Sequence, residues 1–324
     1  MKSLIDYSLN EEYAKMKKLG DNLAKIESLI DWEAFRLIIA GMYKNKTGRG
    51  GRPNIDEILM IKILILQEWH GLSDPELERQ ITDRISFRKF LGFPGNIPDY
   101  STVWYFRERL VETGKDKEIW GELQRQLDAM GLKVKKGVIQ DATFITSDPG
   151  HARADKTRGD EARTRRSKDG TWAKKNSKSY FGFKLHAKSD IDYGLIRDIE
   201  TTTASVHDSQ VDLSEHGEVA YKDKGYSGMK SRGYDAAMKR ADRGHPLTTR
   251  DKLRNNRISR KRAPGERLFA VIKTVFKAGH TMVTTVNRAG VKMVFACFGF
   301  NLYQLLTLKK LHNFVVQKMC IEFQ

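Results

Sequence analysis

The stretch that decides the fold of this chain is RAPGERLFAVIKTVF, at residues 262–276. We expect it to form a helix that begins at Pro264, because proline is well tolerated in the first turn of a helix. The apolar positions follow the i, i+3, i+4, i+7 spacing of one buried face: Leu268, Val271, Ile272 and Val275. Glu266 and Lys273 fall on the opposite face, about 10 Å apart along the axis, which is too far for an easy ion pair. They belong either to an ordinary solvated face or to a face that meets other groups.

The chain carries a large excess of positive charge. Its 324 residues include 58 Lys and Arg against 41 Asp and Glu, which gives a formal net charge of +17 and a pI near 9.7. Residues 1–137 contribute only +2 of this charge, and residues 138–324 contribute +15. Such an excess predicts a polyanionic partner that lies mainly on the C-terminal part, with nucleic acid as the first candidate and an anionic membrane surface as the alternative.

The composition is otherwise that of a globular protein, with 40% apolar and 10% aromatic residues. The most apolar run, residues 58–66, is short and contains Lys62, so we expect a core helix there and not a membrane span. The N-terminus lacks the apolar core of a signal peptide. Cys297 and Cys320 provide neither a disulfide framework nor a metal knuckle, and a reducing cytoplasm is the expected location.

Residues 1–132 predict an all-α domain. Helices are expected over residues 10–41, 55–70, 74–83, 87–90 and 101–112. Asp74, which precedes a proline, and Ser101 are candidate N-caps. A tight turn at residues 71–73 joins two of these helices and resembles a helix-turn-helix, although a helical bundle used for dimerisation fits the same pattern.

A connector rich in glycine and basic side chains interrupts these helices at residues 46–53, KTGRGGRP. The cations in or beside it are candidates for contact with nucleic acid: Lys44, Lys46, Arg49 and Arg52. A basic loop can also serve solubility alone.

From residue 133 the pattern changes to that of a mixed α/β domain. Strands are expected over residues 138–145, 180–186, 194–201, 218–223 and 245–249, the second and third of which form a hairpin. Helices are expected over residues 209–215, 231–243, 264–276 and 291–308. Three strands followed by alternating helices and strands indicate an α/β fold with a mixed sheet. We assign this domain to residues 133–308 and regard residues 309–324 as an appendage.

Two segments of the second domain are strongly basic. Residues 150–178 hold ten Lys and Arg against four Asp and Glu, with almost no aliphatic side chain larger than alanine, so we expect a mobile basic insertion. It is either a variable surface insertion or an arm that follows a nucleic-acid strand. Residues 222–262 hold 14 Lys and Arg against four Asp, and a phosphate backbone could meet several of these cations: Lys224, Arg260 and Lys261.

Three acidic residues form the candidate catalytic and metal-binding set. Asp141 lies inside an apolar strand, where a carboxylate is unfavourable unless it is paired or bound to a cation. Asp223 ends a second strand, and Glu266 projects from the helix. Three carboxylates among many cations favour Mg²⁺ held for work on phosphodiesters, with two ions about 4 Å apart at the attacking and leaving oxygens.

Each of these acids also has a plain structural explanation, as an edge-strand residue, a turn cap or a residue favoured by the helix dipole. Other aspartates compete for the same role: Asp148, Asp208 and Asp251. Asp208 is most simply a helix N-cap.

The spaced acids and their neighbours resemble the DDE motif of bacterial insertion-sequence transposases of the IS5 group. The matching segments are VIQDAT at residues 138–143, YKDKGY at residues 221–226, and the helix positions Arg262, Glu266 and Lys273. The N-terminal part also resembles that family's N-terminal domain, so the similarity covers roughly residues 45–308. In the related IS4-type signature a tyrosine precedes this arginine by three positions, where the present chain has Ser259.

The resemblance implies an RNase H-like catalytic fold behind the helical domain. It also implies metal-dependent cleavage and strand transfer at the inverted-repeat ends of an insertion element. It carries catalytic and metal-binding roles onto Asp141, Asp223 and Glu266, and DNA-contact roles onto Arg262 and Lys273. The implied cofactor is Mg²⁺, as two ions for which Mn²⁺ can substitute.

The partners implied are double-stranded DNA, as terminal inverted repeats and target, and further copies of the chain in a homodimer or larger assembly. The implied location is the bacterial cytoplasm, at the nucleoid. Two alternatives stay open: a non-catalytic DNA-binding regulator derived from a transposase, and a structure-selective nuclease on the same fold.

Overall fold

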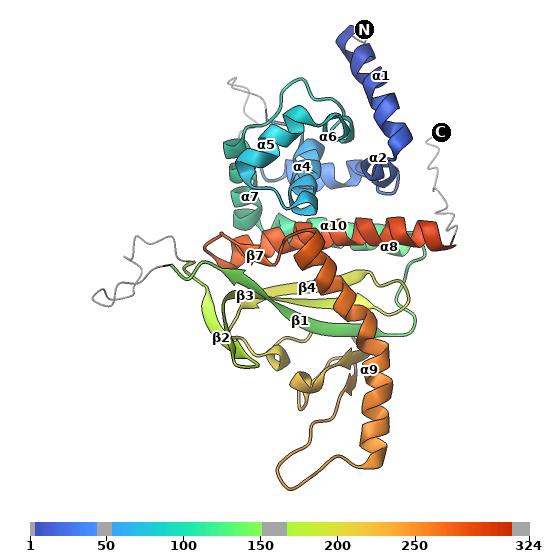
Figure 1. Ribbon diagram of the computed structural model, residues 1–324, viewed down its shortest axis with the longest axis vertical. Coiled ribbons are helices and arrows are strands. Elements are labelled where there is room, and N and C mark those ends of the chain that lie inside the picture. The colour runs from blue at the N-terminus through green and yellow to red at the C-terminus, as the bar shows by residue number, and fades with distance from the viewer. Residues whose placement is uncertain (1–3, 44–53, 151–166, 313–324) are drawn as a thin grey trace, which may run out of the picture. The chain divides into compact units, whose positions relative to one another are not determined.

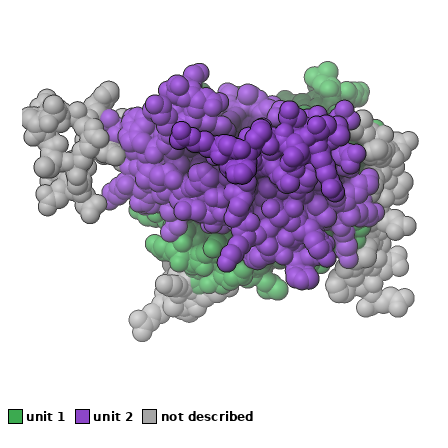
Figure 2. All heavy atoms as spheres, turned by 90° about the horizontal axis from the view of Figure 1, so that it is seen from below, with its two compact units in different colours: residues 1–132, 301–324 green, residues 133–300 purple. Residues whose placement is uncertain are grey.

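The structure is a computed structural model that describes residues 4–43, 54–150 and 167–312 (Figure 1). The chain divides into two compact units, one formed by residues 1–132 and 301–324 and the other by residues 133–300 (Figure 2). The last helix contributes residues to both units.

The first unit has the helical N-terminal region that was predicted. Its helices are α1 Leu4–Leu19, α2 Asn22–Glu27, η1 Glu33–Phe35, α3 Arg36–Ala40, α4 Glu57–His70, α5 Asp74–Asp83, α6 Ile85–Phe90, α7 Tyr100–Thr113 and α8 Lys115–Ala129. The single helix expected over residues 10–41 is wrong, because the left-handed Gly20, with φ of +100°, ends α1. Asp21 then accepts the Leu23 N–H at 2.9 Å and begins α2. Helix α8 was not predicted.

The caps of two helices differ from those expected. Asp99, and not Ser101, caps α7, because its carboxylate accepts the Thr102 N–H at 2.7 Å. The N-cap of α5 is Ser73, and Asp74 is the first residue of that helix. The Asp74 carboxylate instead accepts a hydrogen bond from the Arg107 guanidinium at 2.7 Å. The sequence therefore located these helix starts correctly to within one residue but chose the wrong capping side chain.

Helix α4 confirms the core helix expected of residues 58–66, all of which are buried. Lys62 is accommodated in this run because its ammonium group has partners. Its Nζ donates to Glu27 Oε1 at 2.9 Å and to the Phe90 carbonyl at 3.1 Å. A lysine in an apolar helix is thus explained by an ion pair within the first unit.

The second unit is built on a mixed seven-stranded sheet. Its strands are β1 Val138–Ser147, β2 Thr171–Lys175, β3 Lys178–Asp190, β4 Ile196–Thr203, β5 Val219–Lys222, β6 Tyr234–Ala237 and β7 His280–Thr281. The order is β2-β3-β1-β5-β6, with β4 also paired to β3 and β7 to β1. Strand β1 is antiparallel to β3 and parallel to β5. The predicted hairpin is confirmed as β3 and β4, and the predicted mixed sheet is confirmed with it.

Several local predictions in this unit are wrong. The helix expected over residues 209–215 is reduced to the short η2, Asp208–Gln210. The helix expected over residues 231–243 is replaced by β6, because β5 completes its backbone hydrogen bonds with this segment. The strand expected over residues 245–249 is a single bridge between Asp242 and His245, and Pro246 lacks the N–H that a longer ladder needs.

The expected mobile insertion at residues 150–178 lies partly outside the described residues. Its C-terminal end is not an irregular loop, because residues 171–175 form β2 and pair with β3. Asn176 and Ser177 connect the two strands with positive φ angles of 49° and 64°, as a tight two-residue hairpin turn requires. This end of the basic segment is therefore an ordered hairpin.

Helix α9, Thr249–Ala270, lies against β1 and β5 and continues into the π-helix η4, Val271–Val275 (Figure 1). The prediction that the helix begins at Pro264 is wrong. Thr248 and Asp251 form a capping box at the true start, which leaves Pro264 inside the helix. The π-helix adds a residue to the turn, so Phe276 is fully buried whereas Val275 is 50% exposed. Val275 is thus a wrong member of the predicted buried face.

Helix α10, Val286–His312, contains the predicted helix of residues 291–308 and extends it at both ends. Its residues Val286–Lys310 are long and apolar enough to cross a membrane, but 78% of the most apolar window is buried. The core helix of a soluble protein has the same properties. Of the predicted appendage, residues 309–312 end α10, and residues 313–324 lie outside the described residues.

The π-helix makes a testable difference between two adjacent side chains. Phe276→Ala should lower the free energy of unfolding by about 3–5 kcal/mol, because it empties a fully buried site. Val275→Ala, at an exposed site, should change it by no more than about 0.5 kcal/mol. Equilibrium urea denaturation measures both. If the helix continued without the π-turn, Val275 would be the core residue and the two effects would exchange places.

Candidate active site

Asp141 lies in β1, and Asp223 directly follows the adjacent parallel strand β5. The ladder between β1 and β5 pairs Ile139 with Tyr221, and each aspartate follows two residues beyond this pair. Side chains two residues apart project from the same face of a sheet, and neighbouring strands are about 4.8 Å apart. The negative charge of Asp223 acts on the titration of Asp141. The structure therefore brings these two predicted acids together.

Helix α9 approaches this face of the sheet closely because residue 265 is glycine. A Cβ atom at Gly265 would lie only 3.0 Å from Ile139 Cγ2, closer than ordinary carbon contacts allow. One turn earlier, Arg262 donates a hydrogen bond from its NH2 group to Asp141 Oδ2 at 3.0 Å. The close approach of α9 thus supplies a cation to the charged residue of β1.

The Asp141 carboxyl has an altered acidity. Burial raises its pKa above the usual range, and the negative charge of Asp223 raises it further. The charge of Arg262 and a hydrogen bond from the Ala142 N–H at 2.9 Å lower the pKa and offset part of this effect. The side chain is still 24% exposed. A carboxyl with a raised pKa, reachable from solvent and beside a second acid, is a candidate functional group.

Glu266 lies on α9 four residues after Arg262, on the same helix face and about 6 Å away. Its side chain is exposed, and within the described residues no hydrogen bond or ion pair joins it to Asp141 or Asp223. Those parts of the chain likewise contain no group of three or more His, Cys, Asp or Glu that could hold a metal ion. The third predicted acid is thus placed on the adjacent helix but is not assembled with the other two.

Tyr226 also lies in this region, and it was not among the predicted site residues. It is fully buried, and its hydroxyl has no hydrogen-bond partner among the described residues. Burial, followed by the charges of Asp208, Asp141 and Asp223, raises the pKa of Tyr226 far above its usual value. The phenol therefore stays neutral beside the acids. An aromatic residue directly after the Lys-Gly turn that follows Asp223 was the signal that could have found it.

The competing aspartates each have a structural role. Asp148 accepts the Gly150 N–H at 2.7 Å, and Asp251 closes the capping box of α9. Asp208 is not the N-cap that was expected, because His207 caps η2. Instead, Asp208 Oδ1 accepts a hydrogen bond from Lys184 Nζ at 2.8 Å.

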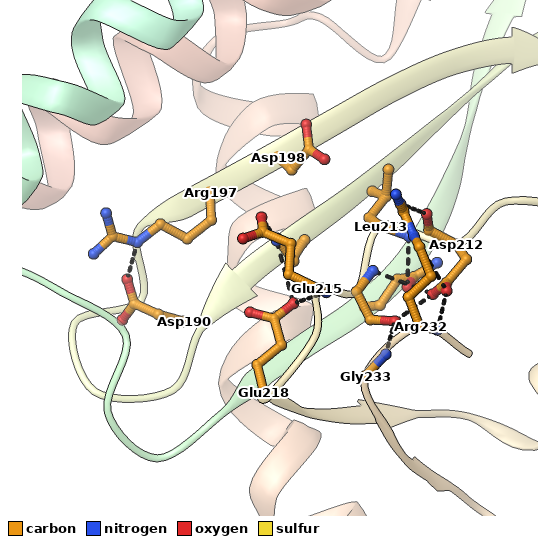
Figure 3. Close-up of polar contacts among 12 residues, drawn as sticks. Asp190, Arg197, Asp198, Asp212, Leu213, Glu215, Glu218, Arg232 and Gly233 are labelled. Carbon is orange, nitrogen blue, oxygen red and sulfur yellow. Dashed lines mark hydrogen bonds and ion pairs between the residues drawn. The ribbon is translucent and has the colours of Figure 1, made fainter.

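A buried polar network fixes the chain just before Asp223. Lys222 is fully buried, and its Nζ donates to Asp212 Oδ1 at 2.9 Å and to Ser231 Oγ at 2.9 Å. The backbone N–H of Arg232 donates to Asp212 Oδ2 at 2.7 Å, and Figure 3 shows Asp212 beside Arg232 and Gly233. These contacts hold the end of β5 against the segment that leads to β6. No local sequence pattern indicates this network, because its partners are 9 to 20 residues apart.

The predicted DNA-contacting cations are placed unevenly. The exposed ones are Lys224, Arg260 and Lys261. Lys273 is half-buried, and Arg262 is engaged with Asp141. The basic residues of the first connector, Lys44, Lys46, Arg49 and Arg52, lie outside the described residues.

Two neighbouring carboxylates, one within β1 and one directly after β5, a helix that brings an arginine to the first, and a strongly basic unit are features of an enzyme that acts on nucleic acid. Comparison with protein families identifies the class of enzyme. Residues 132–302, more than half of the chain, match the transposase DDE domain, and residues 11–109 match a transposase domain (DUF772). The chain therefore belongs to the DDE transposases and functions in DNA transposition. No solved structure matches it.

The raised pKa of Asp141 predicts a specific pH dependence of stability. A carboxyl whose pKa is raised on folding destabilises the fold only when it is ionised. The destabilisation is absent below the unfolded pKa of about 3.9 and is complete above the folded pKa. As pH rises through this window to 7, Asp141→Asn should gain stability relative to wild type. Urea denaturation at several pH values measures the difference.

Asp212 provides a control of opposite sign. Burial acts to raise its pKa, but hydrogen bonds from Ser214, Arg232 and Lys222 outweigh it and lower the pKa to about 2. Asp212→Asn should therefore lose stability relative to wild type as pH rises from about 2 to 4. A loss for Asp141→Asn over its own window would contradict the account of that residue.

Proposed function

We propose that this transposase cleaves DNA at the inverted-repeat ends of an insertion element of the IS5 group and transfers the resulting strands to a target. The observation that carries the proposal is the pair of Asp141 in β1 and Asp223 directly after the adjacent parallel strand β5, with Arg262 of α9 on Asp141. We also propose that the mixed sheet with α9 across it is an RNase H-like fold. In the block of residues 133–308, Asp141, Asp223 and Glu266 would be the catalytic residues.

DDE transposases typically use divalent metal ions, and the donor chemistry of this site fits them. Both aspartates offer hard carboxylate oxygens of the kind that Mg²⁺ and Mn²⁺ prefer. Asp141, Asp223 and Glu266 would hold the ions, two in number, and bound ions would supply Lewis-acid stabilisation and activation of water or a 3′-hydroxyl. Because Arg262 donates to Asp141 Oδ2, a metal ion on that oxygen would compete with the guanidinium.

The chain's own cations would then position DNA. An arginine released from Asp141 can bind a phosphate in bidentate fashion, and Arg262 is in place to do so. Exposed Arg260 and Lys261 lie one turn or less away on α9, Lys224 follows Asp223, and Lys273 follows on η4. We assign DNA-end recognition or dimerisation to the helices of residues 1–132, with Arg49 and Arg52 as further DNA contacts. The working form would be a homodimer or larger assembly on DNA in the bacterial cytoplasm.

A second function is favoured by two observations. Glu266 has no described contact with the aspartates, and Arg262 occupies Asp141, as would suit a non-catalytic DNA-binding regulator derived from a transposase. Such a protein would bind the element ends without needing metal. A structure-selective nuclease would cut DNA without joining it and without preference for inverted repeats.

Cleavage of a labelled duplex that carries the DNA ends flanking the gene tests the proposal. Wild type with Mg²⁺ should cut at the end boundary and join the cut strand to a target duplex. Asp141→Asn and Glu266→Gln should each lower the cleavage rate by more than about 100-fold, since even changes around metal ligands have effects of 10–100-fold. Their affinity for the duplex should be retained.

Asp148→Asn is the matched control, because it removes the next aspartate along the chain and should leave cleavage near the wild-type rate. Tight, end-specific binding by wild type without cleavage would favour the regulator. Cleavage without strand joining would favour the nuclease.

A further inference from the structure

A pocket of about 350 Å³ lies between the β2–β3 hairpin, strand β1 and helix η4. Three lysines line it, Lys175 and Lys178 from the hairpin and Lys273 from η4. Phe144 and Tyr180 form an aromatic wall, with parallel rings whose centroids are 4.7 Å apart. All of these residues belong to the unit of residues 133–300. None of the hairpin residues was assigned a role by the sequence motif.

The lysines of this pocket lack the partners that other lysines of the structure have. Lys62, Lys184, Lys188 and Lys222 are buried, and each forms an ion pair with a carboxylate. Figure 3 shows Glu215 and Glu218, whose carboxylates form the ion pairs with Lys188. Lys175 and Lys178 are exposed and Lys273 is half-buried, and within the described residues their amino groups form no ion pair or hydrogen bond. The pocket therefore has an unmatched positive charge.

The hairpin itself concentrates this charge. The β2–β3 register places Lys175 directly opposite Lys178, and like charges at opposed positions destabilise a pair of strands. Burial, and then the charge of Lys175, lowers the pKa of Lys273. A fold that holds three mutually repelling cations around one pocket gains stability when an anion enters it.

The pocket lies near Asp141, the residue at which DNA cleavage is proposed. Lys175 of the hairpin and Thr143 of β1 line the same pocket. Thr143 is two residues from Asp141 on the same face of β1. An anion in the pocket would therefore be a near neighbour of a phosphate held at the acids. Successive phosphates of one DNA strand have this relationship.

We propose that the β2–β3 hairpin is a DNA-binding element and that its lysine pocket, with Lys273, binds a backbone phosphate next to the one that is cut. This inference rests on the proposed cleavage of DNA and adds a binding subsite to it. Of the two interpretations of the basic insertion, it selects the arm that follows a nucleic-acid strand for residues 171–178. The hairpin holds the strand in register with Asp141 and Asp223.

Binding of the labelled end duplex, measured without divalent metal over a range of salt concentrations, tests the subsite. Lys175→Ala and Lys178→Ala should each weaken binding and reduce the slope of log affinity against log salt by about 1, as expected for one lost phosphate contact. Lys174→Ala is the matched control, because this exposed lysine of β2 does not line the pocket. Its slope should stay near the wild-type value.

A charge reversal separates DNA binding from folding. Lys178→Glu would face Lys175 across the hairpin and replace a repulsive pair with an attractive one. We expect this variant to melt at the same or a higher temperature than wild type while its DNA affinity falls by more than that of Lys178→Ala. A lower melting temperature together with weaker binding would indicate a structural role and would overturn the proposal.

Replacement of single phosphates by neutral methylphosphonates locates the contact. One substitution, adjacent to the scissile position, should weaken binding of wild type and have no further effect on Lys178→Glu. If wild type cleaves the duplex but the hairpin variants keep its affinity and salt slope, the pocket proposal fails and the proposed function stands. If wild type neither binds nor cleaves the ends, both fail.

Discussion

The carboxylate of Asp141 is a charge placed within the central strand of a sheet, and the arrangement of residues 133–300 depends on how that charge is compensated. An ionised carboxylate in a largely buried position is unfavourable without a partner. Helix α9 provides the partner, because Gly265 lets its backbone lie against β1 and Arg262 then reaches Asp141. Since Asp223 directly follows the adjacent strand β5 and adds negative charge, the site favours a second cation as well. The compensation within the chain is therefore partial, which is what a site that binds cations requires.

The need to compensate buried charge, both negative and positive, also explains how charged residues are distributed in the unit of residues 133–300. Each of the buried lysines described above forms an ion pair with a carboxylate, as Lys222 does with Asp212 near the end of β5. Where lysines surround the pocket of the β2–β3 hairpin, no described carboxylate pairs with them. The aspartates of the site, which lack sufficient cations, are thus close to lysines of the pocket, which lack carboxylates. A DNA phosphate with its metal ions complements both, since it brings positive ions to the aspartates and negative oxygens to the lysines.

The sequence predicted those parts of the fold that depend on local pattern. The α4 core helix, the β3–β4 hairpin and the position of Asp141 within a strand follow from periodicity and turn residues. It could not predict features that depend on contacts distant in sequence. Residues 234–237 became β6 because β5 offered a free edge, and Thr248 with Asp251 started α9 well before Pro264. The π-turn at η4 exchanged the burial of Val275 and Phe276. In the site, the pairing of Arg262 with Asp141, the buried Tyr226 and the hairpin pocket all require the tertiary fold.

The central claim is that Asp141 and Asp223 form a cation site that competes with Arg262. A crystal structure of the protein with Mn²⁺, recorded at a wavelength where manganese scatters anomalously, tests it most directly. The account predicts an anomalous peak between the two carboxylates, with the Arg262 guanidinium moved away from Asp141. Full occupancy of the Arg262 to Asp141 ion pair without a peak between the aspartates, at millimolar Mn²⁺, would contradict it.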